Sequence, residues 1–354
     1  MTANANQVVD SIAALSREGY REIALYAAPR GYVALDLSDN TNLWGAPPAA
    51  LRAIAAPRAG IVSRYPVAYE PSLAAAVADY VGVSADMIAC GCGSDDVLDS
   101  AIRAFAQQGE VLCLPDPSFS MIPVFARTNG MVPVAVSLTP ALDADAIVET
   151  RARIIYLCTP NNPTGGALSR DTVEDIVERA PGLVIIDQAY VEFGGVDFID
   201  LARSGRPVLV TRTMSKAFGL AGLRVGYGVG APELIGEVLK ARGPYKVSSL
   251  AERAAIAALK SERAWVSERI KEVVVNRSRL RAELKMRGID AFESAANFIL
   301  VPANDCVALA ARLEQLGVRV RAMPKLRGIG DAIRVAVGPW EMMHHFLDAL
   351  EEAT

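Results

Sequence analysis

From about residue 85 the chain alternates short, β-rich apolar runs with amphipathic stretches. The apolar runs read MIAC, EVLCL, MVPVAV, RIIYLC, GLVIID, PVLVT and RVGYGVG, and helical patterns such as DDVLDSAIRAFAQQ and RDTVEDIVERA separate several of them. Continuous apolar runs are typical of strands buried on both faces, and intervening helices favour parallel pairing. The sequence therefore predicts an α/β fold with a mostly parallel central sheet and helices on both faces.

The pattern changes after about residue 246. A long helical region spans residues 248–288, and the strand patterns NFILV, VRVRA and AIRVAV and a closing helix follow it. We expect these elements to form a smaller α/β C-terminal domain, joined to the first domain by the long helix.

Composition and charge narrow the possible function classes. The 354 residues, 52% hydrophobic and 21% charged, suit about two globular domains. A net charge of −4 provides no electrostatic footprint for nucleic acid or an anionic membrane. No apolar run reaches the roughly 18 residues of a membrane helix, and the N-terminus shows no secretion signal. We expect no nucleic-acid or membrane partner.

Cysteine and histidine usage predicts neither a disulfide framework nor a metal site. The five cysteines are odd in number and mostly lie in apolar runs, as expected of buried thiols in the cytoplasm. Cys90 and Cys92 do not have the usual spacing of zinc ligands. His344 and His345, the only histidines, belong to the terminal helix pattern, where we expect a surface position.

Ligands of open parallel sheets bind beyond the C-terminal ends of the strands. The first such end, after MIAC, is a glycine turn at Gly93 followed by Ser94, Asp95 and Asp96 as candidate N-cap residues of a helix. A helix N-terminus suits a phosphate group, although such junctions are common. Phe119, after EVLCL, either stacks on a planar ligand or belongs to the core.

The next strand ends carry polar side chains. TPNNPTGG follows RIIYLC, and its amides at Asn161 and Asn162 indicate either a binding loop or a simple turn. Asp187 ends the run GLVIID, where a buried carboxylate needs a cationic partner that the neighbouring sequence lacks. A ligand with a protonated ring nitrogen would supply that cation, and Tyr190 adds a hydroxyl group.

Two cations follow the run PVLVT, in TRTMSKAFGLAGLRVGYGVG. Lys216 lies among small residues just beyond a strand end. Desolvation or a nearby cation would lower its pKa and leave more neutral amine to attack a carbonyl. Arg224 has the planar fork that suits a phosphate. A surface loop with two solvated cations is the alternative.

One ligand uses all five strand ends, and that ligand is pyridoxal 5′-phosphate. We expect its aldehyde at Lys216, its ring oxygen at Asn162 and Tyr190, and its protonated ring nitrogen at Asp187. The phosphate is expected at the Gly93–Ser94 turn, where Asp95 follows, and at Arg224.

Three motifs identify a resemblance. N-P-T-G occupies Asn162 to Gly165, D-x-A-Y occupies Asp187 to Tyr190, and S-K-A-F-G-L-A-G-L-R-x-G runs from Ser215 to Gly226. The chain resembles, over nearly its whole length, the fold-type-I, class I/II aminotransferases, especially the histidinol-phosphate and aromatic amino acid aminotransferase group. The resemblance implies a pyridoxal-phosphate-dependent transaminase with a ping-pong Schiff-base mechanism. Its expected substrates are histidinol phosphate or an aromatic amino acid, and a 2-oxo acid such as 2-oxoglutarate. Lys216, Asp187 and Tyr190 are the implied catalytic residues.

The same resemblance implies a homodimer with shared active sites. R-Y-P at 64–66 matches the segment whose tyrosine, here Tyr65, reaches the cofactor phosphate of the neighbouring subunit. Thr213 and Ser215 fall at phosphate-contact positions of the family.

Substrate contacts follow from the resemblance in the same way. Arg334 matches the family's carboxylate-binding arginine. Arg321 and Tyr26 match contacts to the distal end of the substrate, and Asn42 is a further expected contact. An ordinary exposed strand position is the alternative for Arg321.

The predicted division of the chain has three parts. Residues 1–46 form an N-terminal arm and part of the small domain, residues 47–246 the large domain that binds pyridoxal phosphate, and residues 247–354 the small C-terminal domain.

The sequence departs from the family pattern at two motifs. N-E-N-P-Y-G is replaced by N-T-N-L-W-G at 40–45, and D-E-A-Y contains Gln188. The first departure falls in the segment that covers the active site and leaves the substrate open, since Trp44 adds apolar bulk that favours an aromatic side chain over a phosphorylated imidazole. Two alternatives to transamination remain at this point, a decarboxylase of the threonine-phosphate type and a non-catalytic module that binds pyridoxal phosphate.

Overall fold

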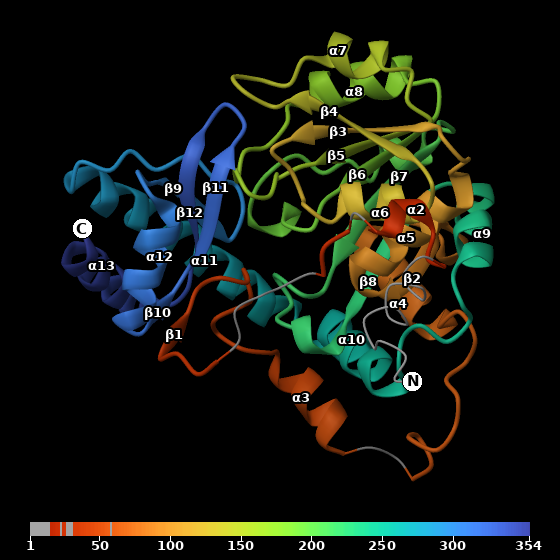
Figure 1. The fold of residues 1–354 in the computed structure, drawn as a ribbon. Coiled ribbons are helices and arrows are strands. Elements are labelled where there is room, and N and C mark those ends of the chain that lie inside the picture. Colours follow the sequence, from red (N-terminus) through yellow and green to blue (C-terminus); the bar gives the residue numbers. More distant parts are fainter. Residues whose placement is uncertain (1–14, 22, 26–30, 57–58) are drawn as a thin grey trace, which may run out of the picture.

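The computed structural model describes residues 15–21, 23–25, 31–56 and 59–354, and shows a large and a small lobe (Figure 1). The large lobe contains a seven-stranded sheet of order β2-β8-β7-β6-β5-β3-β4. Its strands are β2 (Ile88–Cys92), β3 (Val111–Asp116), β4 (Val132–Ser137), β5 (Ile154–Cys158), β6 (Leu183–Asp187), β7 (Val208–Thr213) and β8 (Val225–Val229). All seven predicted apolar runs are strands of this sheet, which confirms the predicted fold class.

The sheet is parallel from β7 to β4, and β8 runs antiparallel to both β2 and β7. The loop 214–224 that joins β7 to β8 holds only the short 3-10 turn η4 (Ala221–Leu223). A parallel connection normally needs a crossover of a dozen or more residues, usually a helix, so this short loop returns the chain in the opposite direction.

Helices cover both faces of the sheet. Consecutive β6 residues show this, because Ile185 belongs to one hydrophobic cluster and Ile186 to the other. The covering helices and turns of the large lobe are α4 (Pro71–Val81), η1 (Ala85–Met87), α5 (Gly93–Phe105), α6 (Ile122–Thr128), α7 (Ala144–Glu149), α8 (Arg170–Arg179), η2 (Val191–Phe193), η3 (Leu201–Arg203), α9 (Pro232–Ala241) and α10 (Ser249–Ser261).

The small lobe is built on an antiparallel sheet of order β11-β12-β9, formed by β11 (Arg321–Leu326), β12 (Gly330–Ala336) and β9 (Phe298–Pro302). Its helices include α12 (Cys306–Gln315) and α13 (Trp340–Ala353). The N-terminal strand β1 (Leu35–Asp36) pairs in parallel with β10 (Val318–Arg319), so an early segment joins C-terminal elements. Two further helices, α2 (Glu18–Arg21) and α3 (Pro48–Ala55), precede the large lobe.

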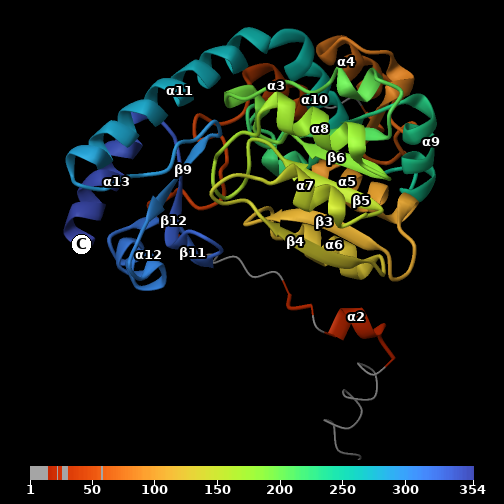
Figure 2. The same cartoon turned by 90° about the horizontal axis from the view of Figure 1, so that it is seen from above.

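The long helical region predicted over residues 248–288 is two helices, so the expectation of one long helix was wrong. The break lies at Glu262, between α10 and α11 (Arg263–Met286). The Glu262 carboxylate accepts the backbone N–H of Ala49 at 2.8 Å, in the first turn of α3. This contact satisfies a helix N-terminus that has no side-chain cap of its own. Beyond the break, α11 runs from the large lobe into the small lobe (Figure 2).

The cysteines and histidines lie largely where the sequence predicted. Cys90, Cys113, Cys158 and Cys306 are buried, all five cysteines are free, and Cys92 is exposed. His344 and His345 are exposed on α13. Among the described helices, none combines the length and apolar character of a membrane span.

A buried ion pair connects the start of α4 to the segment after α9. The Arg242 guanidinium donates to the Glu70 carboxylate at 3.0 Å, and both side chains are fully buried. Glu70 also accepts the backbone N–H of Val247 at 3.4 Å. Burial raises the pKa of Glu70, and Arg242 opposes that rise.

We expect Glu70→Ala to lower the free energy of unfolding by about 3–5 kcal/mol, because it leaves the buried Arg242 guanidinium with only the more distant Asp96 carboxylate, at 4.0 Å. Residue 70 has a left-handed backbone conformation, which is equally unfavourable for alanine and glutamate. The difference in stability between the wild type and the variant therefore reports the loss of the carboxylate. Urea denaturation measures the change. Glu237→Ala, which removes an exposed partner of Lys240, is the control and should cost less than about 1 kcal/mol. Equal losses in the two variants would contradict this expectation.

Candidate active site

Lys216 lies half-buried in the loop after β7. Its Nζ donates to the backbone oxygen of Asp39 at 3.0 Å and lies 5.8 Å from the centre of the Tyr190 ring. Burial, helped by the positive charge of Arg334, lowers the pKa of Lys216 to about 8. A substantial fraction of the amine is therefore neutral near neutral pH, as a nucleophile requires.

Asp187 ends β6 and is 3% exposed. Its carboxylate accepts the Tyr156 hydroxyl at 2.8 Å and the Ala189 backbone N–H at 3.2 Å. Burial raises the pKa of Asp187 to about 6, and the Tyr156 hydrogen bond opposes the rise. Within the described ranges no cation forms an ion pair with this carboxylate, so the position fits a protonated ring nitrogen.

Sequence reasoning missed Tyr156. It lies on β5, next to β6 in the sheet, and its hydroxyl is the shortest side-chain contact of Asp187. The available signal was a phenol inside the apolar run RIIYLC, because a buried tyrosine hydroxyl usually has a partner.

In the turn between β2 and α5, Gly93 and Ser94 pack closely against Arg224 and Gly226, and we call this turn the glycine seat. Gly93 has φ of +80°, and a Cβ there would lie 2.5 Å from the Arg224 guanidinium. A Cβ at Gly226 would collide with the Ser94 backbone nitrogen. Only glycine fits both positions, and the N–H groups at the start of α5 remain close to a ligand in this seat.

The predicted capping of α5 was wrong. The helix begins at Gly93, so Ser94, Asp95 and Asp96 lie in its first turn and Cys92 is the N-cap residue. Asp96 instead accepts the backbone N–H of Cys92 at 3.1 Å, because its side chain can fold back over the turn.

Polar groups of three segments converge on this seat. Arg224 contacts the Ser215 hydroxyl and the Asp95 carboxylate, each at 3.3 Å, and Thr213 donates to Ser215 at 3.0 Å. Burial raises the pKa of Asp95, and Arg224 opposes the rise. These donors and the helix N-terminus together suit a phosphate group.

Arg334 connects the small lobe to the loop after β5. Its guanidinium donates to the Asn162 side-chain oxygen at 2.6 Å and to the Ser38 backbone oxygen at 2.7 Å. Arg321 lies directly opposite Arg334 in the β11–β12 pair, so both side chains leave the same face of that sheet. Two cations therefore lie on the face of the small-lobe sheet from which Arg334 reaches Asn162.

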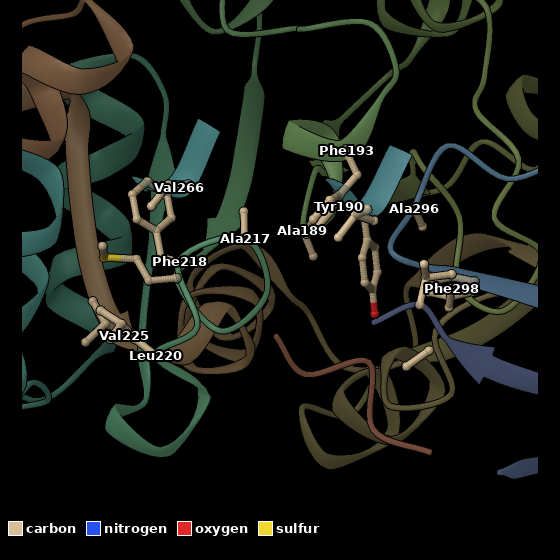
Figure 3. Close-up of a cluster of buried hydrophobic side chains, with 14 of the residues drawn as sticks. Ala189, Tyr190, Phe193, Ala217, Phe218, Leu220, Val225, Val266, Ala296 and Phe298 are labelled. Atoms are coloured by element: carbon tan, nitrogen blue, oxygen red, sulfur yellow. The ribbon is translucent and has the colours of Figure 1, made fainter. Parts of the chain in front are cut away.

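Tyr190 lies between the lobes, packed edge-on against Phe298 with ring centres 5.2 Å apart (Figure 3). The Asn40 amide donates to the Tyr190 hydroxyl at 3.2 Å, and the Asn297 amide donates to the Asn40 backbone oxygen at 3.0 Å. Three consecutive residues, 38–40, thus contact Arg334, Lys216 and Tyr190. Asn40 was not among the predicted site residues.

Residues 33–350 match the family described as "Aminotransferase class I and II". The chain belongs to this family. It is a pyridoxal-phosphate-dependent transaminase, and the buried Asp187 and the glycine seat at Gly93 fit that cofactor.

Individual relatives agree with the family. The histidinol-phosphate aminotransferase of Roseiflexus castenholzii is 37% identical over 333 residues, covering 90% of this chain and 89% of its own. The aromatic amino acid aminotransferase of Corynebacterium efficiens is 35% identical over 330 residues, with coverages of 88% and 94%. A crystal structure of histidinol-phosphate aminotransferase from Sinorhizobium meliloti in complex with pyridoxal-5'-phosphate superposes with a TM-score of 0.88 at 25% identity, covering 100% of this chain and 98% of that one.

Three further predicted residues make contacts of their own in this aminotransferase. Tyr65 is 83% exposed and stacks on Tyr245, with ring centres 4.9 Å apart. Phe119 is half-buried and packs against a hydrophobic cluster of the core. Tyr26 lies outside the described residues. Asn42 uses its amide within the chain, donating to the Ala217 backbone oxygen and accepting the Trp44 N–H, each at 3.0 Å.

Asn161 braces its own loop. Its side chain bonds to the backbone oxygen of Pro117 and to the hydroxyls of Ser118 and Thr164. Only the neighbouring Asn162 meets the other predicted site residues, through Arg334.

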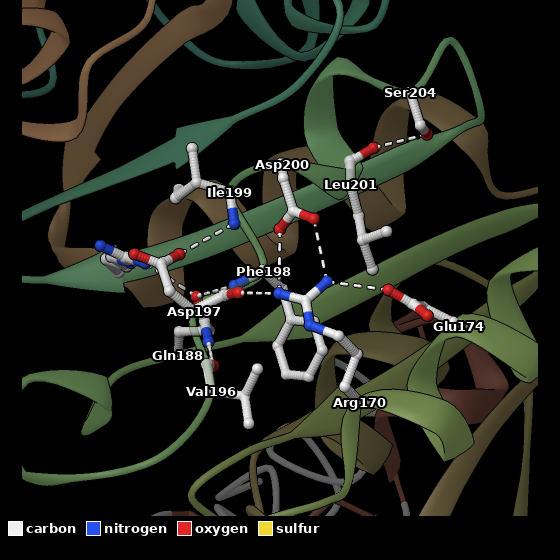
Figure 4. A network of polar contacts seen from close by, with 11 residues as sticks. Arg170, Glu174, Gln188, Val196, Asp197, Phe198, Ile199, Asp200, Leu201 and Ser204 are labelled. Carbon is white, nitrogen blue, oxygen red and sulfur yellow. Dashed lines mark hydrogen bonds and ion pairs between the residues drawn. The ribbon is translucent and has the colours of Figure 1, made fainter.

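Gln188, where the family pattern has glutamate, belongs to a buried brace behind the site (Figure 4). Its amide donates to the Val196 backbone oxygen at 2.7 Å and accepts from Arg212 at 2.9 Å. Arg212 also donates to Asp197 at 2.6 Å. Asp197 thus supplies the carboxylate that pairs with Arg212. A glutamate at position 188 would replace the amide N–H donor with a carboxylate oxygen, which would lie against the oxygen of the Val196 carbonyl with no hydrogen to share.

Proposed function

We propose that this aminotransferase takes the amino group of histidinol phosphate and passes it to a 2-oxo dicarboxylic acid such as 2-oxoglutarate. The observation that supports this most is the pairing of Arg321 and Arg334 on one face of the small-lobe sheet. Two guanidinium groups on one face suit a substrate group that carries two negative charges. The names of several relatives agree with this donor.

An aromatic amino acid is the second candidate donor. Trp44, half-buried against the main core, is the apolar bulk that favours it, and the Corynebacterium efficiens relative carries that activity in its name. Neither the decarboxylase nor the non-catalytic alternative is favoured, since the named relatives are aminotransferases.

The proposed roles follow the geometry. Bound pyridoxal phosphate supplies an aldehyde that reacts with amines and a protonated ring that withdraws electrons from the substrate carbon. Lys216 would hold the aldehyde and, once displaced, carry the proton from the substrate Cα as general base and then acid. Asp187, ionised at neutral pH with its pKa of about 6, would keep its negative charge at the ring nitrogen. Asn162 and Tyr190 would bond to the ring oxygen.

The remaining proposed residues bind rather than react. The cofactor phosphate would take the backbone N–H groups of Ser94 and Asp95 with the side chains of Thr213, Ser215 and Arg224. Phe119 would face the ring. Arg334 would receive the carboxylate of the 2-oxo acid, and also the phosphate of histidinol phosphate, which has no carboxylate.

A donor screen tests the proposal. The enzyme loaded with pyridoxal phosphate is assayed with histidinol phosphate, phenylalanine and tyrosine, each with 2-oxoglutarate as acceptor, and glutamate formation is measured. We expect the highest kcat/KM for histidinol phosphate. A higher value for phenylalanine or tyrosine would select the second donor, and carbon dioxide release without glutamate would overturn transamination.

We expect Arg334→Lys to lower kcat/KM for 2-oxoglutarate about 100-fold, mainly through KM. Lysine keeps the charge but loses the planar fork that binds a carboxylate with two hydrogen bonds. Steady-state kinetics measure the change, and Arg319→Lys is the control because that arginine pairs with Asp36 and Glu314 instead. An unchanged KM would show that Arg334 does not bind the substrate.

We propose a homodimer in which Tyr65 completes the partner's site. Its neighbourhood is apolar and exposed, with Val62, Val67, Tyr69 and Tyr245 between 41% and 78% exposed, as expected of a surface that a second subunit covers. Mixing Lys216→Ala chains with Tyr65→Ala chains should restore activity, because a hybrid dimer has one site with neither change. Sedimentation of a monomer, or mixtures no more active than their components, would contradict shared sites.

We also place the enzyme in the cytoplasm. Its five free cysteines support a reducing compartment. Its substrates are small amino and 2-oxo acids, and the net charge of −4 supports our expectation that it has neither a nucleic-acid nor a membrane partner.

A further inference from the structure

A cavity of about 380 Å³ lies along α11, and none of the predicted site residues lines it. Residues 277–285 of α11 form one wall, and residues 292–299, at and before the start of β9, form the other. The volume falls within the range of small-molecule sites in proteins.

The helix wall of this cavity is strongly basic. Arg277, Arg281 and Lys285 are spaced by four residues, which places them on one face of α11. Glu293 is the only carboxylate in the lining; it pairs with Arg281 at 2.9 Å, and its side chain is 84% exposed. Three cations and one carboxylate leave a formal charge of +2 around the cavity.

Two of these cations have no carboxylate partner in the described part of the chain. Arg277, half-buried, donates only to the backbone oxygens of Phe193 at 3.3 Å and Ala296 at 2.6 Å. Burial lowers the pKa of Arg277, which is the sign of an incompletely compensated charge. Lys285 forms no ion pair with a residue in the described ranges. A bound anion would compensate the half-buried Arg277, and the exposed ammonium of Lys285 could contact the same anion.

We propose that this cavity, residues 277–285 and 292–299, binds a small dianion with phosphate or dicarboxylate groups. The arginine forks and the lysine ammonium are the recognition groups. The two serine hydroxyls of the lining already donate within the chain, Ser278 to the Val274 backbone oxygen and Ser294 to that of Phe298. Binding therefore depends on the cations, and the net charge of +2 of the lining, Glu293 included, matches a dianion.

The cavity shares a wall with the active site. Ser294 packs against Gly165, where a Cβ would collide with its hydroxyl, and the Ala295 N–H donates to the Gly165 backbone oxygen at 2.8 Å. Gly165 lies three residues after Asn162 in the loop between β5 and α8. Arg277 also holds Phe193, close after Tyr190 along the chain. The proposed ligand thus lies between α11 and residues 292–299, which contact the loop that carries Asn162. This position is outside the catalytic centre.

Thermal unfolding of the enzyme loaded with pyridoxal phosphate tests the proposal. The Tm is measured at pH 8 with sodium phosphate, sodium succinate or sodium chloride at equal ionic strength. The variant Arg281→Gln/Lys285→Gln removes two cavity charges. The control Lys271→Gln/Arg312→Gln removes two exposed charges outside the cavity, with the same change in net charge.

We expect phosphate, succinate or both to raise the Tm of the wild type and of the control variant by about 2 °C over chloride. In the cavity variant the anion concentration that gives half of this rise should increase at least tenfold. A phosphate-only rise that the cavity variant weakens would assign the ligand to the phosphate class, and a succinate-only rise that it weakens would assign it to the dicarboxylate class. No rise in the wild type, or an equal rise in the cavity variant, would overturn the proposal. Because this readout is binding, it is independent of the donor screen.

Discussion

Replacing Lys216 with alanine is expected to lower kcat by at least about 10⁴-fold while pyridoxal phosphate still binds. In the proposed mechanism, Lys216 both holds the aldehyde and carries the substrate proton, so the variant would lose both contributions at once. The phosphate seat at Gly93, Ser215 and Arg224 stays intact, so the cofactor is retained without a covalent bond. Single-turnover kinetics measure the rate, and mass spectrometry after borohydride reduction should find the cofactor attached at position 216 only in the wild type.

Lys240→Ala is the matched control, because Lys240 is an exposed surface lysine that pairs with Glu237. It should keep the wild-type rate. Transamination by Lys216→Ala at near the wild-type rate would remove Lys216 from the mechanism.

The lowered pKa of Lys216 has a separate consequence for the cofactor-free protein. The group is neutral above its folded-state pKa of about 8 and charged below it. The rate at which pyridoxal phosphate attaches covalently should therefore rise with pH and level off above about pH 8. For an ordinary lysine the rise would continue to about pH 10.

Asp187→Ala is expected to lower kcat about 10³-fold, because the ring nitrogen loses the buried carboxylate that keeps it protonated. Asp187→Asn keeps the shape without the charge and should be nearly as slow, whereas Asp187→Glu should retain more activity. Stopped-flow measurement of the first half-reaction separates this step from product release. Wild-type rates in Asp187→Asn would show that the charge is not needed.

Tyr156→Phe is expected to weaken the negative charge of Asp187 without removing the carboxylate. The Tyr156 hydroxyl helps to keep the pKa of Asp187 down to about 6, so its loss should raise that pKa by about one unit. Asp187 then takes up its proton at higher pH, and the acid limb of the rate profile should move upward. The expected loss at pH 7 is about twofold and grows toward tenfold below pH 6, and an unmoved acid limb would show that Tyr156 serves only packing.

Much of the fold could be read from local patterns. The seven apolar runs became the seven strands because each is short, continuous and bounded by turn residues. The break at Glu262 could not be read, since the helical pattern continues across it and the cause is a contact with Ala49, 213 residues away along the chain. The start of α5 was misplaced for a similar reason, because the β2–β8 pairing and the glycine seat determine where the strand ends.

Residue types indicated the lysine, the aspartate and the glycine turn as candidates because each lies at or just after a strand end, and the motif spacing indicated the arginine. They were not sufficient for the residues that support them. Tyr156 reaches Asp187 across 31 positions, and Asn40 reaches Tyr190 across 150. Tyr156 stands out in the sequence only as a phenol inside an apolar run, and the partners of both Tyr156 and Asn40 are revealed only by the folded chain.

The sequence by itself determined the fold class, the cofactor and most of the groups that would hold it, because strand ends and motifs are local properties of the chain. The tertiary structure alone decided how those groups are supported, that Arg321 and Arg334 lie opposite each other in the small-lobe sheet, and where α11 and residues 292–299 enclose a basic cavity. Side chains distant in sequence meet only when the two lobes pack together, and their burial then sets the charges and pKa values on which the chemistry depends.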